Sequence, residues 1–291
     1  MIIKAIKSYI YSLLLGGSPI FVTVVTFIKV SGKHSSMRTL LAYRELIRNL
    51  VVKDLKLKYR DSVLGFLWSL ANPLLLILVY SFVFSHILKT TIVNFSYFLL
   101  IGILPWNFFA QSMMMSTGSI LESGGLIRKV AVPMEVFPVA TVLFNLAQFG
   151  LALIVFVPMT VLFFQVPMSL VTLWFCPLLI LHMLFTLGLS FVISTATVFY
   201  RDVRHFIEIA LLLLFWLTPI IYDVKDIPES LQSAIYLNPQ SFFILSYQDI
   251  LYRQAVPDFS RFTILMLLTA FSLLIGYKVH RSYKARFAEE V

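Results

Sequence analysis

A series of basic residues is the clearest pattern in this sequence that has a chemical use. Four cations recur on one helical face between Leu40 and Arg60, namely Arg44, Arg48, Lys56 and Arg60. Apolar side chains recur at helical spacing on the other face. A basic amphipathic helix of this kind is suited to lie along the inner surface of a membrane, where its cations attract phosphates of lipid headgroups.

The sequence offers no catalytic residue, no cofactor site and no metal site. It lacks a Gly-x-x-x-x-Gly-Lys-Ser/Thr phosphate loop, so any ATP chemistry must take place on another chain. Its five histidines are scattered without metal-ligand spacing. His86 is expected at a membrane interface, and His182 lies within an apolar segment, where an interhelical hydrogen bond is favoured over a proton relay. The single cysteine, Cys176, is expected to be a small buried hydrophobe.

Membrane helices must carry these residues. The chain is 59% hydrophobic and 13% charged, with a mean hydropathy of +0.91. Residues 136–200 contain no Asp, Glu, Lys or Arg, and as helix they would span about 98 Å, three times a bilayer core. The segment therefore crosses the membrane twice, with a break at Gln165-Val166-Pro167, because proline cannot donate a backbone hydrogen bond.

We predict an all-α integral membrane protein with six transmembrane helices per subunit. Strands are excluded because the apolar segments are long and continuous. Arg204 and Glu208 lie four apart near one helix end, where a solvated pair is favoured over a transport site. The predicted spans are Ser62–Leu88, Tyr97–Thr117, Val136–Phe164, Ser169–Phe199, His205–Tyr222 and Ser260–Tyr277.

Lysine and arginine set the predicted orientation, because cytoplasmic loops are enriched in them. Alternate connecting segments are strongly basic, which puts both ends of the six-helix unit in the cytoplasm. The external loop from Asp223 to Phe259 is acidic and carries apolar and aromatic residues. Short amphipathic helices at the outer membrane surface would explain that mixture.

These patterns divide the chain into four parts. Residues 1–36 are an extension, either a misplaced start before Met37 or a membrane-associated segment. Residues 37–61 form the cytoplasmic amphipathic interface helix, residues 62–286 the six-helix domain with the external gate segment 223–259, and residues 287–291 a cytoplasmic tail. The segment from Ser119 to Pro133 reads as a short cytoplasmic helix broken at Gly124-Gly125, which is either a connector or a docking site for a soluble partner.

Several motifs resemble the ABC-2 type permeases that export polysaccharides. The stretch KDLKLKYRDSVLGFLWSLANP, from Lys53 to Pro73, resembles the start of that family. Matching motifs follow in order at Leu104-Pro105-Trp106, Phe199-Tyr200-Arg201-Asp202, Thr218-Pro219-Ile220-Ile221-Tyr222 and Asn238-Pro239. The resemblance covers Met37 to about Arg286.

The resemblance implies a transport subunit, not an enzyme. It implies a homodimer in the bacterial cytoplasmic (inner) membrane, paired with two copies of an ABC ATP-binding subunit that holds ATP and Mg²⁺. The substrate would be a polyprenyl-linked polysaccharide such as O-antigen, capsule or teichoic acid, and nucleic acid is not an expected partner. Residues 226–256 would correspond to gate helices above the channel mouth.

The same resemblance suggests three sets of site residues. The residues facing the ATPase would be Ile120, Glu122, Arg128, Lys129, Arg201 and Asp202. The cations Arg44, Arg48, Lys56 and Arg60 would contact either the pyrophosphate of the lipid carrier or anionic headgroups. Sugar rings stack on aromatic faces, so a glycan channel would use Tyr80, Phe84, Trp106, Phe108, Phe109, Phe215, Trp216 and Tyr222, although aromatics in membrane helices also serve as lipid belt and packing.

Two alternatives remain at this point. An ABC-2 permease can instead export a small hydrophobic drug or lipid. An ion-driven secondary transporter, or a membrane glycosyl-transfer enzyme, would function without an ATPase and would need carboxylates within or near the membrane. The first four predicted spans contain none.

Overall fold

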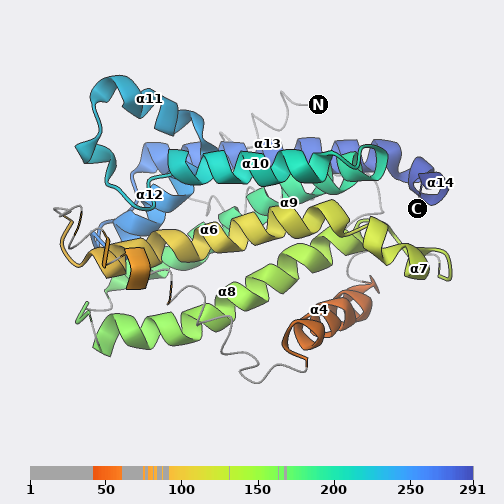
Figure 1. Cartoon of the computed structure of the whole chain (residues 1–291), viewed down its shortest axis with the longest axis horizontal. Helices are drawn as coiled ribbons and strands as arrows, with labels where there is room; N and C mark the ends of the chain where they lie inside the picture. The colour runs from red at the N-terminus through yellow and green to blue at the C-terminus, as the bar shows by residue number, and fades with distance from the viewer. Residues whose placement is uncertain are drawn as a thin grey trace, which may run out of the picture.

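The computed structural model describes residues 42–60, 75, 78–80, 82–83, 87, 92–130, 132–162, 164–166 and 169–290, and within these ranges all regular structure is helical (Figure 1). The longer helices are α4 (Arg44–Tyr59), α6 (Phe95–Gly118), α8 (Val136–Leu162), α9 (Phe175–Phe199), α10 (Val203–Leu217), α12 (Pro239–Leu251) and α13 (Phe259–Tyr283). The shorter pieces are η2 (Leu121–Ser123), α7 (Gly124–Ile127), η3 (Leu170–Trp174), η4 (Val224–Asp226), α11 (Glu229–Leu237), η5 (Lys284–Arg286) and α14 (Phe287–Glu290).

Some sequence predictions lie outside the described residues. They concern the extension 1–36, most of the predicted first span Ser62–Leu88, and with it Phe84 and His86.

Four helical segments of the described chain are long and apolar enough to cross a membrane. They are Phe95–Gly118, Val136–Leu162, Leu170–Phe199 and Phe259–Tyr283, and they coincide with the predicted second, third, fourth and sixth spans. The charge-free run is also broken where predicted: α8 ends at Leu162, Gln165 has a positive φ of 52°, and helix resumes at Leu170.

The predicted fifth span is wrong at its carboxyl end. We expected helix from His205 to Tyr222, but α10 stops at Leu217 and has 15 residues, about 22 Å of helix against a hydrocarbon core of about 30 Å. The cause is local, because Thr218 is extended (φ −97°, ψ 132°) and precedes Pro219. A residue before proline is pushed out of helical geometry.

The predicted external loop contains two α-helices, of which α11 is exposed and α12 is not. Helix α11 has exposed apolar side chains, whereas α12 is buried along most of its length, with Phe243 and Tyr247 fully buried. Asn238 caps α12 by accepting a hydrogen bond from the backbone of Gln240, and Pro239 occupies its first turn. The expectation that these helices lie on the membrane surface is therefore wrong for α12.

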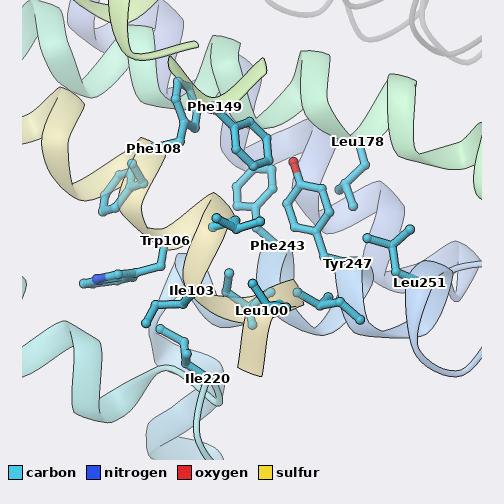
Figure 2. Close-up of a cluster of buried hydrophobic side chains, with 14 of the residues drawn as sticks. Leu100, Ile103, Trp106, Phe108, Phe149, Leu178, Ile220, Phe243, Tyr247 and Leu251 are labelled. Atoms are coloured by element: carbon cyan, nitrogen blue, oxygen red, sulfur yellow. The ribbon is translucent and has the colours of Figure 1, made fainter. Parts of the chain in front are cut away.

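Helix α6 runs through the main apolar core. Phe98 and Leu99 are fully buried, and the α6 face toward α12 packs around Phe243 and Tyr247 (Figure 2). Side chains from α8 and α9 close the same cluster, as Figure 2 shows for Phe149 and Leu178. Phe262, Leu265 and Met266 of α13 belong to it as well, so the core joins α12 to all four candidate spans.

Helices α9 and α13 approach each other closely at two glycines. A β-carbon at Gly276 would meet the carbonyl oxygen of Gly188 well inside 3.0 Å. Because the two helices lie so close, Ser272 on α13 can donate a hydrogen bond to the backbone carbonyl of Phe185 on α9 at 2.9 Å. Small residues at membrane helix interfaces allow such close backbone contact.

A second apolar cluster lies at the end of the bundle that carries α7 and α14 (Figure 1), called the α7 end below. It joins the inner face of α4 to α8, α9 and the chain end. Its buried members are Ile47, Ile120, Val132, Val136, Phe137, Val139, Ala140, Phe191, Val198 and Phe287. The predicted amphipathic helix is thus packed against α8 through its apolar face.

Cys176 differs from its expected environment, since it is exposed at the start of α9 and not buried.

Candidate functional site

The segment 119–133, called the docking segment, joins α6 to α8 at the α7 end (Figure 1). It is not one helix: a turn at Ser119 and Ile120 leads into η2, and α7 begins at Gly124, where a break was predicted. Ile120 is 1% exposed and belongs to the second apolar cluster, so it anchors the segment from inside.

The polar residues of the docking segment face outward. Glu122, Arg128 and Lys129 are all exposed. Arg201 and Asp202, in the turn before α10, are exposed as well. Five of the six predicted docking residues can therefore reach a partner, whereas Ile120 supports them.

A cavity of about 370 Å³ lies beside the docking segment. Its charged lining comes from three elements, with Lys53 and Asp54 on α4, Glu122 on η2 and Arg204 on α10. Lys53 and Asp54 form an ion pair at 3.1 Å. Both signs of charge meet here, together with hydroxyl and apolar side chains, so the cavity suits a polar ligand and not a simple anion.

The predicted cation series on α4 does not line this cavity. Arg44 and Arg48 lie on the exposed face, where each is within 4 Å of Glu45. Lys56 and Arg60 are also exposed. The series therefore lies on the outward surface of α4, and Lys53, which was not among the predicted contacts, is the α4 cation that faces the cavity.

Lys58, a further basic residue of α4, contacts α8. Its ammonium group donates a hydrogen bond to Gln148 of α8 and lies 5.9 Å from the ring centre of Phe144. Burial lowers the pKa of Lys58 because desolvation disfavours its charged form. This contact fixes the carboxyl end of α4 to α8.

An open groove of about 590 Å³ runs between α6 and α10. Trp106 and Phe215 line it, with ring centres 5.7 Å apart in an edge-to-face arrangement. The groove also contains two polar side chains, Gln111 and Glu208. Phe215 beside these hydrogen-bonding groups forms a surface on which a sugar ring can both stack and bind through its hydroxyls, whereas Trp106, only 5% exposed, packs against Phe215.

The other predicted channel aromatics have different surroundings. Phe108 and Phe109 are almost fully buried against Phe149 and His182, and Tyr80 packs against the same main core. Trp216 is 56% exposed on the outer side of α10, and Tyr222 donates a hydrogen bond to its carbonyl at 3.0 Å. Of the seven predicted aromatics that the structure describes, two line the groove.

The predicted pair of Arg204 with Glu208 is wrong. Glu208 lies in the groove and contacts His205 at 3.9 Å, while Arg204 lines the cavity near the docking segment. The sequence reasoning missed Gln111 and gave Glu208 a different role. Glu208 had one signal, because it lies seven residues before Phe215 and so on the same helix face, whereas Gln111 had none.

His182 makes the predicted interhelical hydrogen bond. Its ring nitrogen Nε2 lies 3.1 Å from the side-chain oxygen of Gln240 on α12, and its ring stacks on Phe243 with centres 4.5 Å apart. The hydroxyl of Tyr247 lies 3.5 Å from Nδ1. His182 therefore holds α12 against α9.

An ion-pair network closes the opposite end of the bundle. Arg253 donates to Asp249 and Asp223, each at 2.8 Å, and Arg261 also contacts Asp249. Burial lowers the pKa of Arg253, but its hydrogen bonds to the two carboxylates outweigh that effect and raise it. The network joins the loop after α10, the end of α12 and the start of α13.

Metal-ligating side chains do not gather in the described part of the chain, where no three His, Cys, Asp or Glu residues lie close enough to hold an ion.

Comparison with known proteins gives the family. The chain is 33% identical over 237 residues to the O-antigen export system permease protein RfbA of Klebsiella pneumoniae, covering 81% of this chain and 91% of that protein. It is 34% identical over 257 residues to the protein of the same name in Myxococcus xanthus, covering 88% and 98%. The polysialic acid transport protein KpsM of Escherichia coli is 22% identical over 240 residues, covering 81% and 92%. The ABC-2 type transporter family matches residues 45–252, and the chain belongs to that family.

Proposed function

We propose that this chain is the permease subunit of an ABC exporter that moves a lipid-linked polysaccharide across the bacterial cytoplasmic membrane. The observation that carries the proposal is the 33–34% identity, over most of the chain, to proteins named as O-antigen export permeases. A third relative is named for polysialic acid transport. These names favour a polysaccharide over a small hydrophobic drug or lipid.

The groove between α6 and α10 supports a glycan path. Phe215, supported by the buried Trp106, offers a stacking face that tolerates different sugars, and Gln111 and Glu208 offer hydrogen bonds to hydroxyl groups. Because the groove is open on one side, a second copy of the chain would complete the passage.

Energy would come from a separate ABC ATP-binding subunit, two copies of which would bind ATP and Mg²⁺. The docking segment supports this assignment, since exposed Glu122, Arg128 and Lys129 are carried on a buried anchor at Ile120. Nucleotide binding would close the two ATPases and displace the docking segment. The displacement reaches α8 and α4 through the second apolar cluster, and the two states differ in their affinity for substrate.

In this arrangement the α7 end faces the cytoplasm and the α11 end faces outward, with both ends of the six-helix unit inside. Residues 226–256 would form the outer gate. The exposed cations of α4 would contact the carrier pyrophosphate or anionic headgroups. Arg60→Glu separates these two uses, because lost export with normal membrane insertion favours the carrier and unchanged export excludes it.

Copurification with candidate ATP-binding subunits in nanodiscs tests the proposal. We expect a stable complex whose ATPase rate changes when Glu122, Arg128 and Lys129 are replaced by alanine. A matched control is Lys225→Ala, at the α11 end, which should leave the complex intact. Failure of the wild-type chain to bind any such subunit, with ion-dependent transport by the isolated chain, would overturn the proposal.

A second experiment tests the groove. Trp106→Ala and Phe215→Ala should reduce polysaccharide export while leaving ATPase binding unchanged, because neither residue lies near the docking segment. Trp216→Ala, on the outer side of α10, is the matched control for the glycan contact. Equal export by all three variants would show that the glycan takes another route.

A further inference from the structure

The end of the chain returns to the base of the docking segment. After α13 the chain continues through η5 into α14, and Phe287, the first residue of α14, is fully buried. Its ring lies 5.2 Å from that of His280 and 6.1 Å from that of Phe199. Through these contacts Phe287 belongs to the same apolar cluster as Ile120, the anchor of the docking segment.

An ion pair makes a second connection at the same place. Glu135 lies two residues after the docking segment, directly before α8, and only 7% of it is exposed. Lys284 in η5 donates to both carboxylate oxygens, at 3.1 Å and 3.2 Å. A carboxylate this deeply buried needs a charged partner, because removal of the cation would leave its charge in an apolar setting.

The last turn of α13 supports both connections. The His280 ring lies between Phe287 and Phe191, with centres 5.2 Å and 5.1 Å away. Its Nδ1 atom lies 3.0 Å from the hydroxyl of Thr195 on α9. The tail is therefore attached to the closely packed pair α13 and α9, and Glu135 is attached to the tail.

We propose that the tail segment 284–287 is a positioning element that holds the start of α8, so that movement of the docking segment passes into the membrane helices. The proposal rests on the proposed function and adds Glu135, Lys284 and Phe287 to its working residues. Without the tail, the joint between the docking segment and α8 is free to bend. Displacement of the docking segment would then be absorbed in that joint.

Hydrogen exchange on the complex with its ATP-binding subunit in nanodiscs tests this. In the wild type, a non-hydrolysable ATP analogue should change amide exchange in both the docking segment and the first turns of α8. In Lys284→Ala we expect ATPase binding to persist, exchange at residues 135–140 to rise, and the nucleotide response there to fall about tenfold, within the usual range of coupling between two sites. Lys278→Ala, an exposed cation on the same helix end, is the matched control.

Rescue separates positioning from general loss of stability. Glu135→Lys combined with Lys284→Glu restores the pair with reversed charges and should recover the nucleotide response of α8, whereas either single reversal should not. Phe287→Leu should keep the response and Phe287→Ala should lose it. Wild-type exchange in Lys284→Ala, or an equal loss in Lys278→Ala, would overturn the inference. Failure of the wild-type chain to bind an ATPase would instead reject the proposed function.

Discussion

Replacing Gly276 with alanine is a direct test of the packing between α9 and α13. A β-carbon at this position would overlap the carbonyl oxygen of Gly188. The obstacle is a backbone atom, so no change of rotamer relieves it, and the two helices must move apart. Gly188→Ala should have the same result, since its β-carbon would meet backbone atoms of Ser272 and Leu273.

The size of the effect follows from three contributions. Overpacking at a rigid contact costs about 1–3 kcal/mol, and we expect the upper part of that range because the clash is with backbone. Separation also weakens the 2.9 Å hydrogen bond from Ser272 to Phe185, worth about 0.6 kcal/mol between membrane helices. Alanine returns about 1 kcal/mol through its higher helix propensity. The net loss is about 2 kcal/mol, roughly a thirtyfold change in the ratio of folded to unfolded protein.

Unfolding in detergent, followed by near-UV circular dichroism, measures this loss. Gly150→Ala is the matched control, because Gly150 is also helical but its β-carbon would meet nothing within 4 Å, and stability should rise slightly. Gly102→Ala should fall between the two, since Ile220 lies 3.1 Å from the added carbon. A Gly276→Ala protein as stable as Gly150→Ala would refute the reasoning.

Three further predictions concern polar contacts. Arg253→Ala should lower the free energy of unfolding by about 1–3 kcal/mol, which is less than for a fully buried ion pair because the network is partly exposed. This loss of stability should shrink in high salt. An equal loss in Arg253→Lys would contradict a role for the paired geometry of the guanidinium group. Burial lowers the pKa of Lys58 in the folded state, so the folded protein gains stability as pH rises through that lowered pKa toward 10.5, the unfolded value. Lys58→Met should flatten the rise of melting temperature as the pH approaches 10.5, and an unchanged slope would exclude Lys58 as its source. His182→Phe should lower the free energy of unfolding by about 1–3 kcal/mol, because the amide of Gln240 is left buried without its partner on the histidine ring. The double variant with Gln240→Leu should recover part of this stability. Thermal unfolding of both variants in detergent measures the difference.

The membrane helices were largely predictable because a long charge-free run has few other uses. Residues 136–200 had to cross twice, and the turn around Gln165 falls where the sequence placed it. The error at the end of α10 came from giving apolar content more weight than local geometry. Thr218-Pro219 already marked a boundary in the sequence, since the residue before proline avoids helix.

The position of α12 was beyond sequence reasoning. The acidic loop around this helix made it look like a surface element, but its glutamines have partners on other segments: Gln240 faces His182, and Gln248 donates to the carbonyl of Pro219 at 2.6 Å. Polar residues become compatible with burial only when such partners are in place. One sequence cannot show which partners will meet.

The candidate site divides in the same way. Exposed charges in the docking segment followed from a short polar loop between two apolar runs. The roles of the aromatic residues could not be predicted in this way. Trp106 and Phe108 lie two residues apart on the same helix, and only the packing of α10 and α9 decides which of them lines a groove and which belongs to the core. Glu208 was misjudged for a related reason, since a helical wheel cannot tell solvent from an open groove.

The burial of α12 has a consequence for how the protein is made. Thirteen residues, about 20 Å of helix, are too few to span the bilayer alone. The helix packs against α6, α9 and α13, yet α13 is synthesised after it. Helix α12 can therefore pack on α6 and α9 as soon as it is made, but its contacts with α13 form only after α13 has been inserted. The core around α12 is thus completed by the last of the long helices, and a chain cut before α13 would leave α12 packed on one side only.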